Sequence, residues 1–154
     1  LIVESEGTAN TLVANGFTKR HNAILIGSQG VPSNAVRGWC KLIQDQLRVP
    51  LYFFGDLDAY TLQNIYRTLK AGSAASLIRN SDYSAPDVRF LGVLPEDIKK
   101  YELNDYPVKE HDAQEARALK KAQDALNNDP FFKDKRNKGL ARILEWLIKN
   151  KRRC

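Results

Sequence analysis

The sequence has no methionine among its 154 residues, and it opens on the apolar run Leu1–Val3 instead. This absence indicates a fragment of a longer protein. Only two cysteines are present, Cys40 and Cys154, which are too few for a disulfide framework. Their scarcity suits a reducing compartment such as the cytoplasm.

Long apolar runs are absent as well. No stretch approaches the roughly 18–20 residues that cross a bilayer, and the N-terminus lacks the basic region of a secretory signal. Internal repeats and low-complexity linkers are also missing. With 43% hydrophobic and 27% charged residues, the composition is that of an ordinary globular domain, long enough to bury one core.

Positive charge is concentrated at one end of the chain. Residues 131–154 hold nine lysines and arginines against two acids, whereas the charges of residues 1–130 nearly balance. Four of these cations follow the last helical pattern: Lys149, Lys151, Arg152 and Arg153. We expect them to lie free in solvent, where they either contact nucleic-acid phosphates or only solubilise the helix end.

Short apolar runs alternate with amphipathic segments. The runs predict strands over 1–3, 23–26, 51–54 and 88–93. Helical patterns are predicted at 8–15, 34–47, 62–69, a short stretch from Pro95, 113–127 and 140–148. This alternation predicts an α/β fold, a three-layer Rossmann-like domain with a mostly parallel central sheet, followed by C-terminal helices.

Particular residues predict where helices begin, end and pack. Ser33 is a predicted N-cap and Gly16 a left-handed C-cap, while Asp112 and Glu115 form a capping-box signature. The buried face of the helix over 34–47 is predicted to carry Val36, Trp39, Cys40, Ile43 and Leu47. That of the last helix is predicted to carry Leu140, Ile143, Leu144, Leu147 and Ile148.

Three carboxylates are predicted at one edge of this sheet. Glu4 ends the first strand, and Asp56 and Asp58 follow the third. Ligands of open parallel sheets bind beyond the carboxyl ends of the strands, and residues two apart in an extended segment point the same way. Three oxygen donors without His or Cys suit Mg²⁺. The alternative is that the aspartates are ordinary turn acids, and Glu6, which fits neither strand end, is interpreted as a helix-start acid.

These features resemble a known family. A glutamate at the end of strand one, a glycine-containing turn after strand two and D-x-D after strand three resemble the Toprim domain of topoisomerases and primases. Within that group the chain is similar to the A subunit of topoisomerase VI and its meiotic double-strand-break relatives. The matching stretches are VESEGTANTLVANGF, AILIGSQGVPSNAVRGW, VPLYFFGDLDAYTLQNIY, AGS and FLGVLPEDI.

The resemblance implies roles for individual residues. It makes Glu4, Asp56 and Asp58 the Mg²⁺ ligands, and Glu4 is also a candidate for proton transfer in catalysis. Tyr60 lies beside the acids but in the wrong element for a nucleophile, so it is interpreted as a packing residue or a DNA contact.

The turn after strand two matches the family pattern, whereas the turn after the aspartates departs from it. Gly30 and Pro32 match a G-x-P turn, and Gly30 is a candidate DNA contact. Arg37 matches a basic residue that either approaches a DNA phosphate or is a solvated helix residue. Where the family usually has D-x-D-P-x-G, this chain has Ala59 and Thr61 in place of Pro and Gly.

The resemblance also implies a reaction and partners. In the family, a tyrosine on a preceding winged-helix domain attacks the DNA backbone, and Mg²⁺ is the cofactor. The implied function is the Mg²⁺-binding part of an ATP-dependent type IIB DNA topoisomerase, which cleaves and religates double-stranded DNA. The implied partners are DNA, a second A subunit in a homodimer and an ATPase B subunit. The implied location is the cytoplasm or nucleoid, or the nucleus in a eukaryote.

The resemblance divides the chain into a Toprim core, residues 1–98, and a C-terminal helical extension of the same domain, residues 99–154. Two other functions stay open. The acids could serve another Toprim enzyme, a nuclease or a primase, or the chain could be a non-catalytic module that binds nucleic acid. A winged-helix segment with a tyrosine, upstream of Leu1, would favour the topoisomerase.

Overall fold

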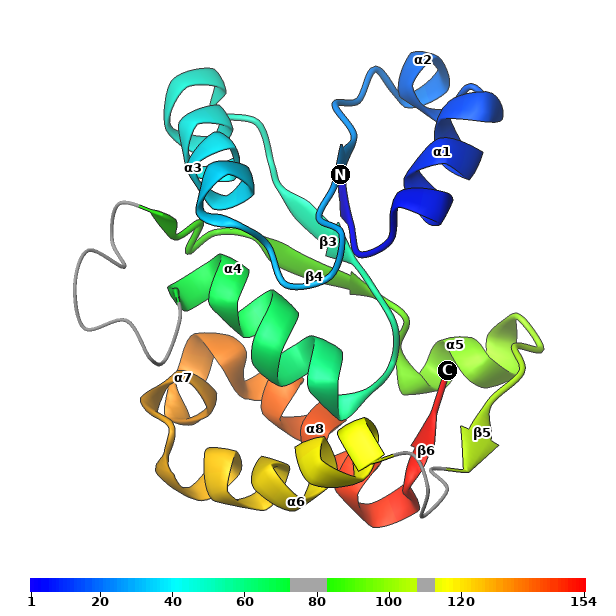
Figure 1. Cartoon of the computed structure of the whole chain (residues 1–154), viewed down its shortest axis with the longest axis vertical. Coiled ribbons are helices and arrows are strands. Elements are labelled where there is room, and N and C mark those ends of the chain that lie inside the picture. Colours follow the sequence, from blue (N-terminus) through cyan, green and yellow to red (C-terminus); the bar gives the residue numbers. More distant parts are fainter. Residues whose placement is uncertain (73–82, 108–112) are drawn as a thin grey trace. The chain divides into compact units, whose positions relative to one another are not determined.

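A computed structural model describes residues 1–72, 83–107 and 113–154 (Figure 1). The chain forms two compact units. The first unit comprises Leu1–Gly55 and Ile65–Leu91, and the second comprises Asp56–Asn64 and Gly92–Cys154. Within the described ranges, no helix has the length and apolar character needed to cross a membrane.

A sheet of four parallel strands, in the order β2-β1-β3-β4, forms the centre of the fold. The strands are β1 (Ile2–Val3), β2 (Ile26–Gly27), β3 (Tyr52–Phe54) and β4 (Arg89–Gly92). The predicted α/β class and parallel central sheet are therefore confirmed. The second strand begins later than the predicted run 23–26, because pairing with β1 starts at Ile26, opposite Ile2.

Helices follow the strands as the periodicity predicts, except for the short helix over 17–21, which no sequence pattern predicts. They are α1 (Glu6–Ala14), α2 (Phe17–His21), α3 (Asn34–Leu42), the π-helix η1 (Ile43–Leu47), the π-helix η2 (Thr61–Tyr66) and α4 (Arg67–Ala71). The caps predicted at Ser33 and Gly16 are confirmed. The Ser33 hydroxyl accepts a hydrogen bond from the Val36 N–H at 3.3 Å, and Gly16, after α1, has a φ of 70°. Glu6 lies in the first turn of α1, as predicted.

The buried face of α3 differs from the predicted one. Cys40 and Ile43 are buried as expected, but Trp39 is 63% exposed and Leu47 is 55% exposed. The side chain of Arg37 is buried and shifts the contact face of α3 away from Trp39. The change from α- to π-helix at Ile43 also alters the angular position of Leu47, because each residue of a π-helix rotates less about the axis.

The core beneath the sheet holds β3 in place. Ile2, Val3 and Phe53 are fully buried. The ring of Phe53 lies 5.7 Å from that of Tyr66 and 6.1 Å from that of Phe90 between centroids, and the Tyr66 hydroxyl donates to the Val88 carbonyl at 2.8 Å. These contacts fix the strand that leads directly into Gly55 and Asp56.

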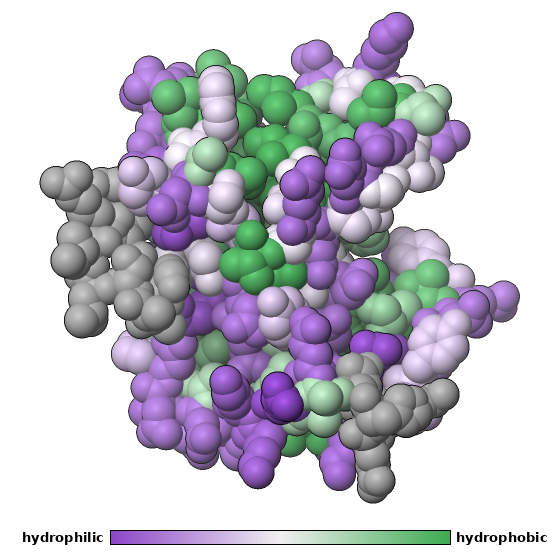
Figure 2. Space-filling model, in the orientation of Figure 1, coloured by the Kyte–Doolittle hydropathy of each residue, from purple (hydrophilic) through white to green (hydrophobic). Residues whose placement is uncertain are grey.

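An apolar hollow of about 480 Å³ opens in the first unit. Its lining includes residues that come immediately before strands, such as Leu1 and Leu51, together with Phe17 of α2. Figure 2 shows hydrophobic side chains gathered on this face. The hollow lies at the amino ends of the strands, so it is at the opposite end of the sheet from Glu4.

The second unit consists mainly of helices. Its elements are α5 (Pro95–Lys100), α6 (Ala113–Asn128), α7 (Pro130–Lys133), the 3₁₀-helix η4 (Lys135–Asn137), α8 (Lys138–Asn150) and the antiparallel pair β5 (Tyr106–Pro107) and β6 (Arg152–Arg153). The predicted start of a helix at Pro95 is confirmed. Leu140, Leu144 and Leu147 of the predicted stripe on α8 are buried. Asp112 of the predicted capping box lies outside the described residues.

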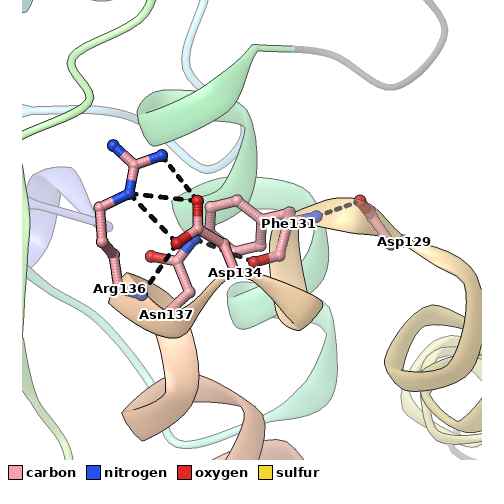
Figure 3. Close-up of polar contacts among 5 residues, drawn as sticks. All are labelled: Asp129, Phe131, Asp134, Arg136 and Asn137. Carbon is pink, nitrogen blue, oxygen red and sulfur yellow. Dashed lines mark hydrogen bonds and ion pairs between the residues drawn. The ribbon is translucent and has the colours of Figure 1, made fainter.

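Side-chain caps set the turns between α6 and α8 (Figure 3). The Asp129 carboxylate accepts from the Phe131 N–H at 2.9 Å and so begins α7. Asp134 accepts from the N–H of Arg136 at 2.9 Å and also pairs with its guanidinium. The buried Asn137 amide donates to the Phe131 carbonyl at 3.0 Å. These bonds reverse the chain so that α8 can pack its apolar stripe.

Candidate functional site

The strand order creates a topological switch point between β1 and β3. From β1 the chain adds β2 on one side and later β3 on the other. Val3 lies opposite Phe54, and the Glu4 N–H donates to the Phe54 carbonyl at 3.1 Å. Ligands of open parallel sheets bind in the crevice beyond such a point. Glu4 and Gly55 therefore leave the sheet side by side where a ligand is expected.

The turn after β2 holds the backbone of Glu4. The Gly30 N–H donates to the Glu4 carbonyl at 3.0 Å, and the buried Ser28 donates its N–H to the Val3 carbonyl at 2.8 Å. Gly30 has a φ of 81°, which glycine adopts without a steric penalty. The glycine of the predicted G-x-P turn thus has a structural role beside Glu4, and its contact with DNA stays a prediction.

The carboxylate of Glu4 lies against Gly55. A Cβ placed on Gly55 would be 2.7 Å from Oε2 of Glu4 and 2.6 Å from Cε1 of the buried Phe53. Only a residue without a side chain allows this close approach. The acidic group at the end of β1 therefore reaches the residue directly before Asp56.

Gly55→Ala should destabilise the fold by about 1–3 kcal/mol, because the new methyl group would overlap the Phe53 ring and displace the Glu4 carboxylate. Gly139→Ala is the matched control. Nothing lies within 4 Å of its added Cβ, and alanine favours the helix α8, so stability should hold or rise by up to about 1 kcal/mol. Urea denaturation of the two variants measures both effects. Equal stabilities would contradict the close approach at Gly55.

The two aspartates of the second unit have different surroundings. Asp56 is exposed, whereas Asp58 is partly buried. Asp58 Oδ1 accepts a hydrogen bond from the Thr61 N–H at 2.6 Å, so Asp58 caps the helical segment that follows. The alternative interpretation of the aspartates as turn acids thus describes part of the role of Asp58. This cap uses one of the two carboxylate oxygens.

The electrostatics of this pair favour a cation. Loss of water around the carboxylate raises the pKa of Asp56, and the negative charge of Asp58 raises this pKa further, whereas Arg153 acts in the opposite direction. The net result is a raised pKa, of which burial is the largest cause and the repulsion between the two aspartates a smaller one. A divalent cation would relieve this repulsion.

Glu115 is a third acid near this segment, and sequence reasoning missed its role. It is 2% exposed, and its carboxylate accepts hydrogen bonds from the N–H groups of Ala59 at 2.7 Å and Tyr60 at 3.2 Å. Burial, with a smaller contribution from Asp58, raises its pKa to about 7. The sequence presents Glu115 only as a capping-box residue, and no local pattern indicates a partner 56 positions away.

Cys154, directly after β6, also holds the D-x-D segment. The Leu57 N–H donates to the Cys154 carbonyl at 2.7 Å, and the Cys154 N–H donates back at 3.2 Å. Leu57 lies between the two aspartates, so these bonds fix the backbone that carries them.

The expectation that the four terminal cations are free in solvent is wrong for Arg152. Its guanidinium forms an ion pair with Asp105, because β6 pairs with β5, which directly follows Asp105. Lys149 and Lys151 are exposed as expected. Phosphate contacts by the tail stay a prediction.

Arg37 lies inside the first unit. It is 4% exposed, Nε donates to the Tyr83 carbonyl at 2.8 Å, and Nη1 donates to Asn34 Oδ1 at 3.3 Å. The interpretation of Arg37 as a solvated helix residue is therefore wrong. A contact with a DNA phosphate stays a prediction, and it would require the side chain to leave these partners.

The three predicted metal ligands are divided between the units. Glu4 belongs to the first unit, and Asp56 and Asp58 belong to the second. No group of three or more His, Cys, Asp or Glu side chains arranged to hold a metal was found among the residues that the structure describes. The convergence of Glu4 with the aspartates stays a prediction.

The family model and the most similar relatives that were compared point to the same family. All of residues 1–154 match the family described as the Toprim domain of Spo11 and of the topoisomerase 6 A subunit. The chain is 38% identical over 133 residues to the A subunit of type 2 DNA topoisomerase 6 from Methanocaldococcus jannaschii, which covers 86% of this chain and 34% of that protein. It is 33% identical over 134 residues to the protein of the same name in Natronomonas pharaonis, covering 87% and 34%. The chain thus spans about a third of the length of these relatives.

Proposed function

Because this chain belongs to the Toprim family of Spo11 and the topoisomerase 6 A subunit, we propose that it is the Mg²⁺-binding part of the polypeptide that cleaves and religates DNA in an ATP-dependent type IIB topoisomerase. The observation that carries the proposal is the position of Glu4. It leaves β1 at the switch point of the sheet, and its carboxylate lies against Gly55, from which the D-x-D segment continues.

The donor set of this segment fits Mg²⁺. Glu4, Asp56 and Asp58 would supply hard carboxylate oxygens, which Mg²⁺ prefers, and waters and substrate phosphate would complete its shell. The repulsion between Asp56 and Asp58, which contributes to the raised pKa of Asp56, supports this fit, because a bound cation would relieve it. When bound, Mg²⁺ would stabilise the charge that develops on the transferring phosphoryl group.

The residues of the chain would position the reacting groups. Asp58 is held by the Thr61 N–H, which leaves its second oxygen to face a ligand. Glu4 is the candidate for a proton transfer. The attacking tyrosine is expected on a winged-helix domain outside these 154 residues. Its hydroxyl would lose its proton and its oxygen would bond to the backbone phosphorus, while the bond from phosphorus to the leaving sugar oxygen breaks and that oxygen gains a proton. Religation would reverse each change.

The proposed partners are double-stranded DNA, a second A subunit in a homodimer, and an ATPase B subunit. On the DNA side, the exposed Lys151 and Arg153 would contact phosphates. Arg152 would have to contact a phosphate while its guanidinium stays paired with Asp105.

Changing Lys151 to glutamine should lower the slope of log DNA affinity against log salt concentration by about one, because one phosphate contact is lost. An unchanged slope would exclude this contact.

The activity of the isolated chain tests whether these 154 residues cleave DNA without the rest of the protein. We expect the purified 154 residues to bind Mg²⁺ weakly in a calorimetric titration, since substrate oxygens are absent, and to leave supercoiled plasmid intact. The natural protein with its B subunit should relax the same plasmid when Mg²⁺ and ATP are present. Mg²⁺-dependent nicking by the isolated chain would contradict the proposal and favour a Toprim nuclease.

A further inference from the structure

The D-x-D segment is fixed to helix α6 through the backbone that follows Asp58. Glu115 of α6 accepts hydrogen bonds from the N–H groups of Ala59 and Tyr60, the two residues after Asp58. The first N–H groups of a helix have no partner inside the helix, so a carboxylate at this place satisfies two of them at once. All four residues belong to the second unit.

A second side chain makes the same connection. The Gln63 amide donates to the Ala59 carbonyl at 2.9 Å and to the Ala118 carbonyl of α6 at 2.9 Å. Ala118 is one helical turn beyond Glu115, so Glu115 and Gln63 attach neighbouring points of α6 to the same turn. This turn cannot rotate relative to α6 without breaking these bonds.

A buried carboxylate at this position costs free energy of folding. Glu115 is 2% exposed, and the negative charge of Asp58 acts on it. A glutamine would avoid the charge, but its amide offers a single acceptor oxygen and would direct its own N–H groups at one of the two backbone donors. Only a carboxylate of this length presents two acceptors to Ala59 and Tyr60.

We propose that Glu115 is a positioning residue for the metal site: it holds the first turn after Asp58 and thereby sets the direction of the Asp58 carboxylate. This inference rests on the proposed function, because it presumes that Asp58 is a metal ligand. Glu115 holds Asp58 through the backbone, and its charge also interacts with that of Asp58, but it is not proposed as a ligand. Partners beyond the ligands of a metal typically change metal affinity by about 10–100-fold when they are removed.

Two substitutions at Glu115 test the proposal in the natural protein. Glu115→Ala should raise the Mg²⁺ concentration for half-maximal DNA cleavage by about tenfold or more, while saturating Mg²⁺ restores most of the rate. Glu115→Gln, which keeps one acceptor, should have a smaller effect. Asp124→Ala removes an exposed acid of the same helix and should change nothing. The affinity for Mn²⁺, measured by electron paramagnetic resonance without DNA, should fall in the same order.

The outcomes distinguish failure of the positioning role of Glu115 from failure of the proposed function. A folded Glu115→Ala variant with an unchanged metal requirement would overturn the positioning role, even if it unfolds at a lower temperature. If Glu115→Ala does not fold, Glu115→Gln decides, and an unchanged Mn²⁺ affinity there has the same consequence. Full cleavage by Asp58→Asn would instead refute the metal assignment, and the proposed function would fail for that reason.

Discussion

Asp56→Asn should reduce DNA cleavage by the natural protein at least about 100-fold, an effect of the size seen when one group that stabilises a transition state is removed. Asparagine keeps the shape of the side chain but supplies a neutral oxygen, which is a poor substitute for a carboxylate ligand of Mg²⁺. Plasmid cleavage at saturating Mg²⁺ measures the loss. Asp124→Asn, an exposed acid on α6, is the control and should cleave normally.

The same substitution should leave the fold intact or stabilise it. The pKa of Asp56 is raised in the folded protein, so the ionised carboxylate costs stability at neutral pH, and asparagine removes that cost. The advantage of the variant should shrink as the pH falls and the wild-type carboxyl becomes protonated in both states. Retained cleavage, or a variant that unfolds at neutral pH, would contradict the role assigned to Asp56.

The stability of the chain should fall as the pH rises from about 4.5 to about 7 because of Glu115. Its pKa is about 7 in the folded protein against an ordinary value of 4.5, so the folded state binds a proton more tightly than the unfolded state. Each tenfold change in proton affinity corresponds to about 1.4 kcal/mol, which gives an effect of about 3 kcal/mol. The stabilisation is complete below pH 4.5 and is lost above pH 7.

Glu115→Gln isolates this effect, because glutamine does not titrate. The free energy of unfolding should be measured in urea between about pH 4.5 and 8.5 for both proteins. The difference between wild type and variant should change by about 3 kcal/mol over this range, and it should favour the wild type more at low pH. Curves that stay parallel would show that Glu115 has an ordinary pKa in the folded protein.

Several features of the site stay predictions. Glu4 and the D-x-D aspartates lie in different units, and the domain boundary at residue 98 also stays a prediction. The Glu4 carboxylate lies beside Gly55, which supports the prediction that Glu4 points towards the segment that follows β3. The match of the whole chain to the Toprim family agrees with the resemblance indicated by Glu4, the glycine-containing turn and the D-x-D segment.

The sequence by itself determined the strands of the central sheet, most of the helices and the identity of the candidate ligands, but not α2, α7 or the strands β5 and β6. Apolar runs predict strands because both faces of a parallel sheet are buried, and Ser33, Gly16 and Pro95 mark helix ends through local geometry. The sequence also places Glu4 and the D-x-D acids immediately after strands. These features depend on neighbouring residues, so they can be read directly from the chain.

Only the tertiary structure decided how distant residues meet. The buried face of α3 turned towards Arg37 because Tyr83 supplies its carbonyl, 46 positions away. Glu115 reached the turn after Asp58 across 56 positions, and Arg152 reached Asp105 across 47. Such contacts satisfy buried or charged groups only after the chain has folded back on itself. They have no period and no fixed spacing in sequence, because a hydrogen bond depends on where two groups lie in space.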